Sequence, residues 1–320
     1  MREPERQAIA ELVAGRLAIL RAAEIGEDSL SELVARLDAL APAQAIELQQ
    51  LATASSIAPE HLLLLDGGLL DALTGAELER SLGLYVDGPD GPVLAGAWAL
   101  PAAEAEQVEL RPLATGGLGF GLPGSFGLAG VAAAGFALLA NLLRPRALGP
   151  GLPGSVVLRG LLDAPTLDHA RAQIEATPLA DGRNWMLADG RVFYGFEQLG
   201  AERILTRVGP KTGHVHANHC FDPSLRQREA TPRSPASFRR LELASTLYVQ
   251  RRPATAAELL EFFDAVEEAA FADPAERAQT LLAIELEAGL AHWRRRAGER
   301  VQTTRFHSPL IPSNLAPGPA

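Results

Sequence analysis

The sequence predicts an α+β fold in which helices and strands form separate groups. Residues 1–80 carry the apolar spacing of amphipathic helices, whereas short apolar runs separated by Gly- and Pro-containing turns begin near Leu82. The expected order is helices, strands, helices, strands and helices. Because strands and helices do not alternate regularly, a doubly wound parallel sheet is not expected.

The helices before Leu82 are predicted from capping and periodicity. Ser29 and Glu32 have the spacing of a capping box, ahead of an apolar run at 30, 33, 37 and 40. A second helix is expected over residues 43–53. A third is expected to begin at Pro59 and to continue to about residue 73, because proline suits the first helical turn.

The middle of the chain predicts strands joined by tight turns. Expected strands cover residues 81–86, 92–100 and 108–113, and the run 184–196 forms a hairpin around Asp189 and Gly190. Residues 126–143 are 18 residues without a charge, long enough for a membrane span. Their three glycines and Asn141 favour two short buried strands instead. A helix is expected at 166–177 between these strands.

The C-terminal part predicts three helices. The first covers 237–247, the second follows a capping box formed by Thr255 and Glu258, and the third covers 275–296. A proline-rich tail ends the chain. We find no internal repeat.

Composition narrows the functional classes. The chain has 320 residues, 47% of them hydrophobic, and no long polar linker, so one large structural unit is expected. With 29 basic and 39 acidic residues the net charge is −10, which disfavours nucleic acid as a partner. The runs Arg239–Arg240 and 294–296 are interpreted as solvated helix faces. A single cysteine and a charged N-terminus without a signal-peptide core favour the cytoplasm.

Residues 213–223, GHVHANHCFDP, form the densest polar cluster. Four of its residues could ligate zinc: His214, His216, His219 and Cys220. No second ligand motif accompanies them, so local hydrogen bonds are the preferred interpretation and no metal is expected. A Cys220–His219 catalytic pair is disfavoured, because neighbours in a strand point to opposite faces. The glycine-rich run 117–124 lacks the Lys and Ser/Thr of a phosphate loop and is interpreted as a strand connection.

Six segments, taken in order, resemble the acyl-coenzyme A:6-aminopenicillanic acid acyltransferase family of N-terminal-nucleophile (Ntn) hydrolases. They are ELQQLATASSIAPEHLLLLDGGLLDAL from Glu47, ERSLGLYVDGPDGPVLAGAWAL from Glu79, GVAAAGFALLANLL from Gly130, RNWMLADG with the later Glu197, HANH at 216–219, and SFRRLELAS from Ser237. The resemblance implies a four-layer αββα sandwich over 81–320, with residues 1–80 as a helical pro-segment packed on it.

The resemblance also implies a mechanism. Members cut their own backbone before the nucleophile, and the freed α-amine then serves as its general base. The matching bond is Arg80–Ser81, and Ser81 stands where the family has cysteine. Asn141 would donate to the oxyanion, and Asn218 would lie beside the nucleophile and its amine. The resemblance adds further supporting residues: Arg80, Trp98, His216, His219, Arg240 and Arg300.

Two functions therefore remain open from the sequence. The first is an Ntn-type amidohydrolase or acyltransferase that acts on a small-molecule amide or acyl thioester through an acyl-Ser81 intermediate, without a cofactor. The second is a degenerate member that is not autoprocessed and serves as a binding or scaffold protein. The two asparagines favour the first. The replacement of cysteine by Ser81, and Ala99 in place of the family aspartate, favour the second.

Overall fold

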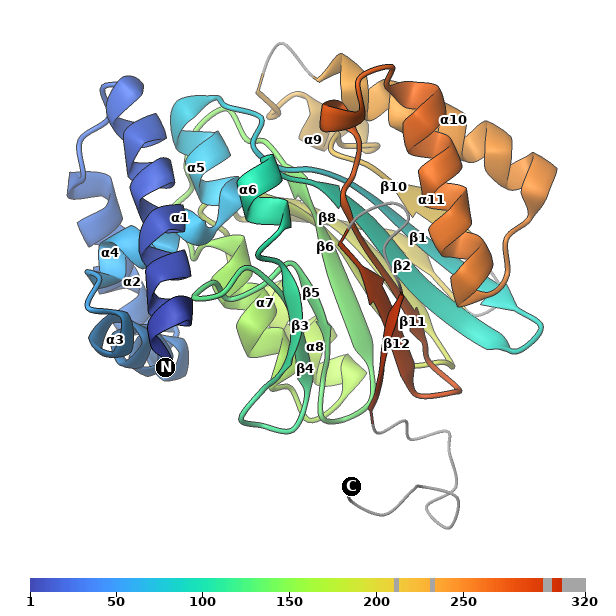
Figure 1. The fold of residues 1–320 in the computed structure, drawn as a ribbon, viewed down its shortest axis with the longest axis horizontal. Helices are drawn as coiled ribbons and strands as arrows, with labels where there is room; N and C mark the ends of the chain where they lie inside the picture. The colour runs from blue at the N-terminus through green and yellow to red at the C-terminus, as the bar shows by residue number, and fades with distance from the viewer. Residues whose placement is uncertain (210–212, 231–233, 296–300, 307–320) are drawn as a thin grey trace.

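Two antiparallel sheets pack face to face at the centre of the molecule (Figure 1). The computed structural model describes residues 1–209, 213–230, 234–295 and 301–306. In spatial order the first sheet contains β10 (His214–His216), β1 (Arg80–Gly88), β2 (Gly91–Ala99), β11 (Thr280–Glu285), β12 (Leu290–Arg294) and β13 (Gln302–Arg305). The second contains β3 (Glu109–Pro112), β4 (Leu118–Gly121), β5 (Ala129–Val131), β6 (Ala137–Leu143), β7 (Gly182–Ala188), β8 (Phe193–Leu199) and β9 (Glu202–Val208).

Helices cover the outer face of each sheet, which gives four layers (Figure 1). The first sheet is covered by α10 (Pro235–Arg251) and α11 (Ala256–Ala270), and the second by α7 (Gly154–Leu162) and α8 (Leu167–Ala176). Strand alternation explains this arrangement, because Leu82 and Leu84 of β1 pack with α11 while Tyr85 stacks on Phe193 of the opposite sheet. The expected αββα sandwich is confirmed.

The N-terminal helices lie beside α7 at one side of the sandwich (Figure 1). They are α1 (Glu3–Ala22), α2 (Asp28–Leu40), α3 (Pro42–Ser55), α4 (Pro59–Leu62), the 3₁₀ turn η1 (Leu63–Leu65) and α5 (Gly67–Thr74). Their buried leucines belong to the same hydrophobic cluster as the second sheet. Short helices α6 (Ala102–Ala105), α9 (Pro223–Arg226) and the turn η2 (Pro274–Glu276) complete the described elements.

The helix expected over 275–296 is wrong, because this segment supplies β11 and β12. Leu281 and Ala283 pack under α11, while Leu282 and Ile284 face the opposite sheet. A strand buried on both faces has a continuous apolar run, which periodicity alone does not distinguish from a buried helix. The turn between the strands contains Gly289 with a φ of 63°, a conformation that suits glycine.

Of the three predicted helix starts, at Ser29, Pro59 and Thr255, the structure agrees with only some. Ser29 does not cap a helix, since α2 already begins at Asp28 and has no side-chain cap. The helix expected from Pro59 is divided into α4, η1 and α5 because Asp66 caps a new start by accepting from the backbone N–H groups of Gly68 and Leu69. The capping box at Thr255 and Glu258 is confirmed at the start of α11.

The uncharged run 126–143 forms β5, a turn and β6, as expected. Within the described residues, no helix is both long and apolar enough to cross a bilayer. Part of the glycine-rich run 117–124 is itself a strand, β4, rather than only a connection between strands.

Candidate active site

Ser81 is the second residue of β1 and is fully buried. It pairs with Trp98 on β2 and shares its strand face with Gly83 and Tyr85, so its side chain faces the space between the two sheets. The hydroxyl therefore lies at the head of a central strand, on the inner side of the sandwich.

One amide holds both polar groups of Ser81. Oδ1 of Asn218 accepts from the backbone N–H of Ser81 at 2.6 Å, and Nδ2 of Asn218 donates to Ser81 Oγ at 3.0 Å. The same Nδ2 donates to the carbonyl of Leu142 on β6 at 3.0 Å. Asn218 thus connects the first residues of β1 to the second sheet.

Asn218 is itself fixed by the start of α10. Its backbone N–H donates to Ser237 Oγ at 2.8 Å, and Ser237 Oγ lies 2.7 Å from Nδ1 of His219. The Ser237 hydroxyl therefore bridges the backbone of Asn218 and the ring of His219. The ring of His219 also stacks on Phe238 at 4.0 Å between centroids.

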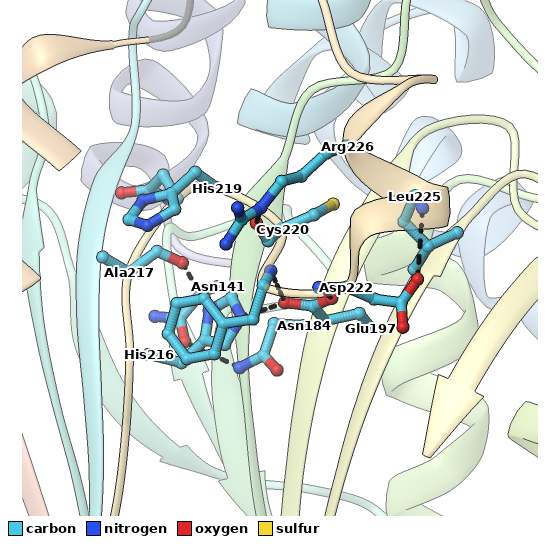
Figure 2. Close-up of polar contacts among 12 residues, drawn as sticks. Asn141, Asn184, Glu197, His216, Ala217, His219, Cys220, Asp222, Leu225 and Arg226 are labelled. Carbon is cyan, nitrogen blue, oxygen red and sulfur yellow. Dashed lines mark hydrogen bonds and ion pairs between the residues drawn. The ribbon is translucent and has the colours of Figure 1, made fainter. Parts of the chain in front are cut away.

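Glu197 on β8 contacts both ends of the loop 217–222 that follows β10 (Figure 2). Its Oε1 lies 2.7 Å from Nε2 of His216, and its carboxylate accepts from the backbone N–H groups of Phe221 and Asp222. Burial opposes ionisation of Glu197, but the hydrogen bonds from His216 and the backbone outweigh it and hold the pKa of Glu197 below its ordinary value. The carboxylate therefore anchors both ends of the loop that carries Asn218.

Asn141 on β6 offers a buried donor at the same interface. Its Oδ1 accepts from Nδ2 of Asn184 at 3.0 Å, which orients the amide, and its Nδ2 has no partner among the described residues (Figure 2). Oδ1 also lies against Gly83, where an added Cβ would come within 2.9 Å of it. Asn141 is thus level with Gly83, two residues along β1 from Ser81, and the following residue Leu142 contacts Asn218.

The family described as "Acyl-coenzyme A:6-aminopenicillanic acid acyl-transferase" matches residues 118–293, more than half of the chain. The chain belongs to this family. The matched range includes Asn141 and Asn218, whereas Ser81 precedes it. A search among curated proteins gave no match.

Solved structures with a related outline have low sequence identity. Penicillin V acylase from Agrobacterium tumefaciens is 15% identical, with a TM-score of 0.46 over 70% of this chain and 86% of that one. A mutant of conjugated bile acid hydrolase from Clostridium perfringens is 11% identical, with a TM-score of 0.44 over 70% of this chain and 92% of that one. A second variant of the same hydrolase is 10% identical, with a TM-score of 0.33 over 75% and 93% of the two chains.

The supporting residues taken from the family resemblance lie in different places. Trp98 pairs with Ser81 and packs on Phe120 at 5.3 Å between ring centroids. Arg80 and Arg240 lie over the same Phe271 ring, at 5.6 and 4.6 Å, on the outer side of the first sheet. Arg300 lies outside the described residues.

Arg240 is fully buried, so its interpretation as part of a solvated helix face is wrong. Its guanidinium makes two hydrogen bonds to Glu267 of α11, at 2.7 and 3.0 Å, and this ion pair joins the two covering helices. Arg294 lies on β12 rather than on a helix and pairs with Asp264 at 2.5 Å.

Ala99, which the family resemblance aligns with an aspartate, pairs with Arg80 and packs in the cluster under α11. A side chain at this position projects to the face opposite that of Ser81. The part of the first sheet beside Ser81 thus gains no carboxylate from β2.

The residues considered as zinc ligands have other neighbours. His216 contacts Glu197, His219 contacts Ser237, and the backbone N–H of Cys220 donates to Glu229 at 2.6 Å. Among the described residues, no three His, Cys, Asp or Glu side chains are placed to hold a metal ion. His219 and Cys220 lie in an irregular loop, so the strand argument against their pairing does not apply.

A pocket is lined by Arg80 and Asn218, and no signal in the sequence predicted it. It is lined by residues from before and after the Arg80–Ser81 bond: Asp71, Glu77, Glu79, Arg80, Leu142, Arg144, Asn218, Glu229, Ala230 and Ser234. Burial raises the pKa of the Asp71 carboxyl to about 8 and that of the Glu79 carboxyl to about 7. Two carboxyl groups with raised pKa values therefore lie in the pocket that Arg80 lines.

Proposed function

We propose that this chain is an Ntn-type amidohydrolase or acyltransferase that acts on a small-molecule amide or acyl thioester. The single observation that supports this most strongly is the contact of one Asn218 amide with both the backbone nitrogen and the hydroxyl of Ser81. Those two groups become the base and the nucleophile of an Ntn enzyme once the Arg80–Ser81 bond is cut.

The reaction then follows from the positions of these groups. After cleavage, the α-amine of Ser81 takes the proton of Oγ, and Oγ attacks the substrate carbonyl to give an acyl-Ser81 ester. The leaving amine or thiol takes the proton from the α-amine. Water or an acceptor amine then removes the acyl group, and no step requires a cofactor.

Asn141 supports this proposal as the oxyanion donor. A buried N–H without a partner costs about 1–3 kcal/mol, and the contact with Asn184 keeps the Nδ2 of Asn141 in that state. An unpaired N–H can donate to an oxyanion that forms near it during the reaction. In other enzymes one such donor contributes about 3–4 kcal/mol to the transition state.

The alternative is an unprocessed binding protein. Two observations favour it: Ser81 is fully buried in the intact chain, and strand β2 beside it carries no carboxylate. In this case the segment 1–80 would remain covalently joined, and the pocket beside Arg80 would take a ligand without chemistry.

Intact mass spectrometry of the purified protein distinguishes the two. The enzyme proposal expects two fragments divided after residue 80, and the alternative expects one chain of 33.9 kDa. Ser81→Ala should remain whole, while Ser81→Cys should be cut at least as fast as the natural chain because a thiol is the stronger nucleophile. A natural chain that remains whole would eliminate the enzyme proposal.

A further inference from the structure

The α-amine of Ser81 cannot be the base for the proposed self-cleavage, because it does not exist in the intact chain. Before the Arg80–Ser81 bond breaks, the nitrogen of Ser81 is an amide and accepts no proton. The described hydrogen-bond partner of Ser81 Oγ is the amide of Asn218, which donates to it. Strand β2 carries no carboxylate, so the first proton transfer needs another group.

Asp71 on α5 is a buried carboxyl group in the pocket that Arg80 and Asn218 also line. It is 1% exposed, and its Oδ1 accepts from the backbone N–H of Leu78 at 2.9 Å, three residues before Ser81. Its Oδ2 is buried and has no partner within the described part of the chain.

The pocket has room for one water molecule. Its volume is about 20 Å³, and a polar cavity of more than about 10–15 Å³ holds one water molecule. A water between Asp71 and the hydroxyl would extend the reach of the carboxylate, as in other general bases that act through one water.

We propose that Asp71 accepts the proton of the Ser81 hydroxyl when Oγ attacks the carbonyl carbon of Arg80. This inference rests on the proposed function. The Oγ–C bond forms, the proton passes to Asp71, and the C–N bond between Arg80 and Ser81 then breaks. Asp71 returns the proton to the departing nitrogen of Ser81, which leaves an ester that water hydrolyses.

The pocket has three other carboxylates, and each has contacts of its own. Glu77 is held by Arg144 at 3.1 Å and by Ser234 at 3.1 Å. Glu229 accepts from the backbone N–H of Cys220. Glu79 packs against Gly67, where an added Cβ would be 3.1 Å from its Oε2.

The charges around Asp71 set the pH at which it becomes a base. Burial has the largest effect and raises the pKa of Asp71 to about 8; Glu79 adds to this rise, and Arg16 opposes it. The pocket also presents Glu77, Arg80, Arg144 and Glu229. Because the ionised carboxylate is the active form, cleavage should accelerate as pH rises and level off above about 8.

The test is the rate of cleavage of freshly purified full-length protein, measured by intact mass from pH 5 to 10. Asp71→Asn retains an oxygen for the N–H of Leu78 and removes only the basic carboxylate. We expect cleavage at least about 100-fold slower, in the range typical of a lost general base, and loss of the rise near pH 8. Glu79→Gln removes a negative neighbour, so it should move the rise to lower pH without abolishing it.

The outcomes separate this inference from the proposed function. If the natural chain is never cut, the proposed function fails and this inference fails with it. If Asp71→Asn is cut at the natural rate with the natural pH profile, only the role of Asp71 is overturned. Should the variant not fold, a natural pH profile without a rise between pH 7 and 9 would overturn the role by itself.

Discussion

Arg16→Met should lower the free energy of unfolding, because it removes an ion pair between the N-terminal helices and α6. Arg16 on α1 is 1% exposed, and its Nε and Nη2 lie 2.7 and 2.5 Å from the two carboxylate oxygens of Glu104 on α6. Removing the guanidinium leaves Glu104 buried without its cation. Loss of one partner of a buried ion pair costs about 3–5 kcal/mol, so we expect that loss in the free energy of unfolding.

Urea unfolding at pH 7 measures this effect, in a Ser81→Ala background that keeps the chain in one piece. The matched control is Arg16→Met with Glu104→Met, which replaces the pair by apolar side chains of similar length. Such replacements are often neutral, so the double variant should recover most of the loss. A single variant that loses less than about 1 kcal/mol, the range of an exposed pair, would refute the reasoning.

Three further perturbations test the site and its supports. Gly83→Ala should place a Cβ within 2.9 Å of Asn141 Oδ1 and 2.7 Å of Met186 Sδ. We expect this overpacking to cost about 1–3 kcal/mol of stability and to slow turnover. Equal urea unfolding midpoints for the variant and the natural chain would contradict this. Glu197→Gln should slow cleavage at Ser81 and weaken the loop's protection in hydrogen exchange, because the neutral amide holds His216 and the backbone less tightly; unchanged protection of residues 217–222 would argue against it. The pKa of Asp71 is raised on folding, so it contributes stability that is complete at pH below about 4 and is lost as pH rises through about 8. In the uncleavable background Asp71→Asn should therefore weaken the fall in melting temperature between pH 5 and 9, and an identical pH dependence would speak against that carboxyl.

Local sequence signals predicted the elements whose cause is local. The capping box at Thr255 and the hairpin around Asp189 and Gly190 depend on residues a few positions apart, and both are present in the structure. The helix expected over 275–296 failed because that segment is surrounded by other elements on both faces. Its backbone follows the strands on either side of it rather than its own helix propensity.

The site shows the same division. Order and residue type along the chain were enough to single out Ser81, Asn141 and Asn218 and to indicate the family. The pocket beside Arg80 and the raised pKa of Asp71 depend on burial of residues far apart in sequence. A carboxyl group acquires a shifted pKa only from the dielectric and charges that surround it. The sequence by itself therefore determined the layered fold and the candidate nucleophile, while tertiary packing alone decided which acids share a pocket with Arg80.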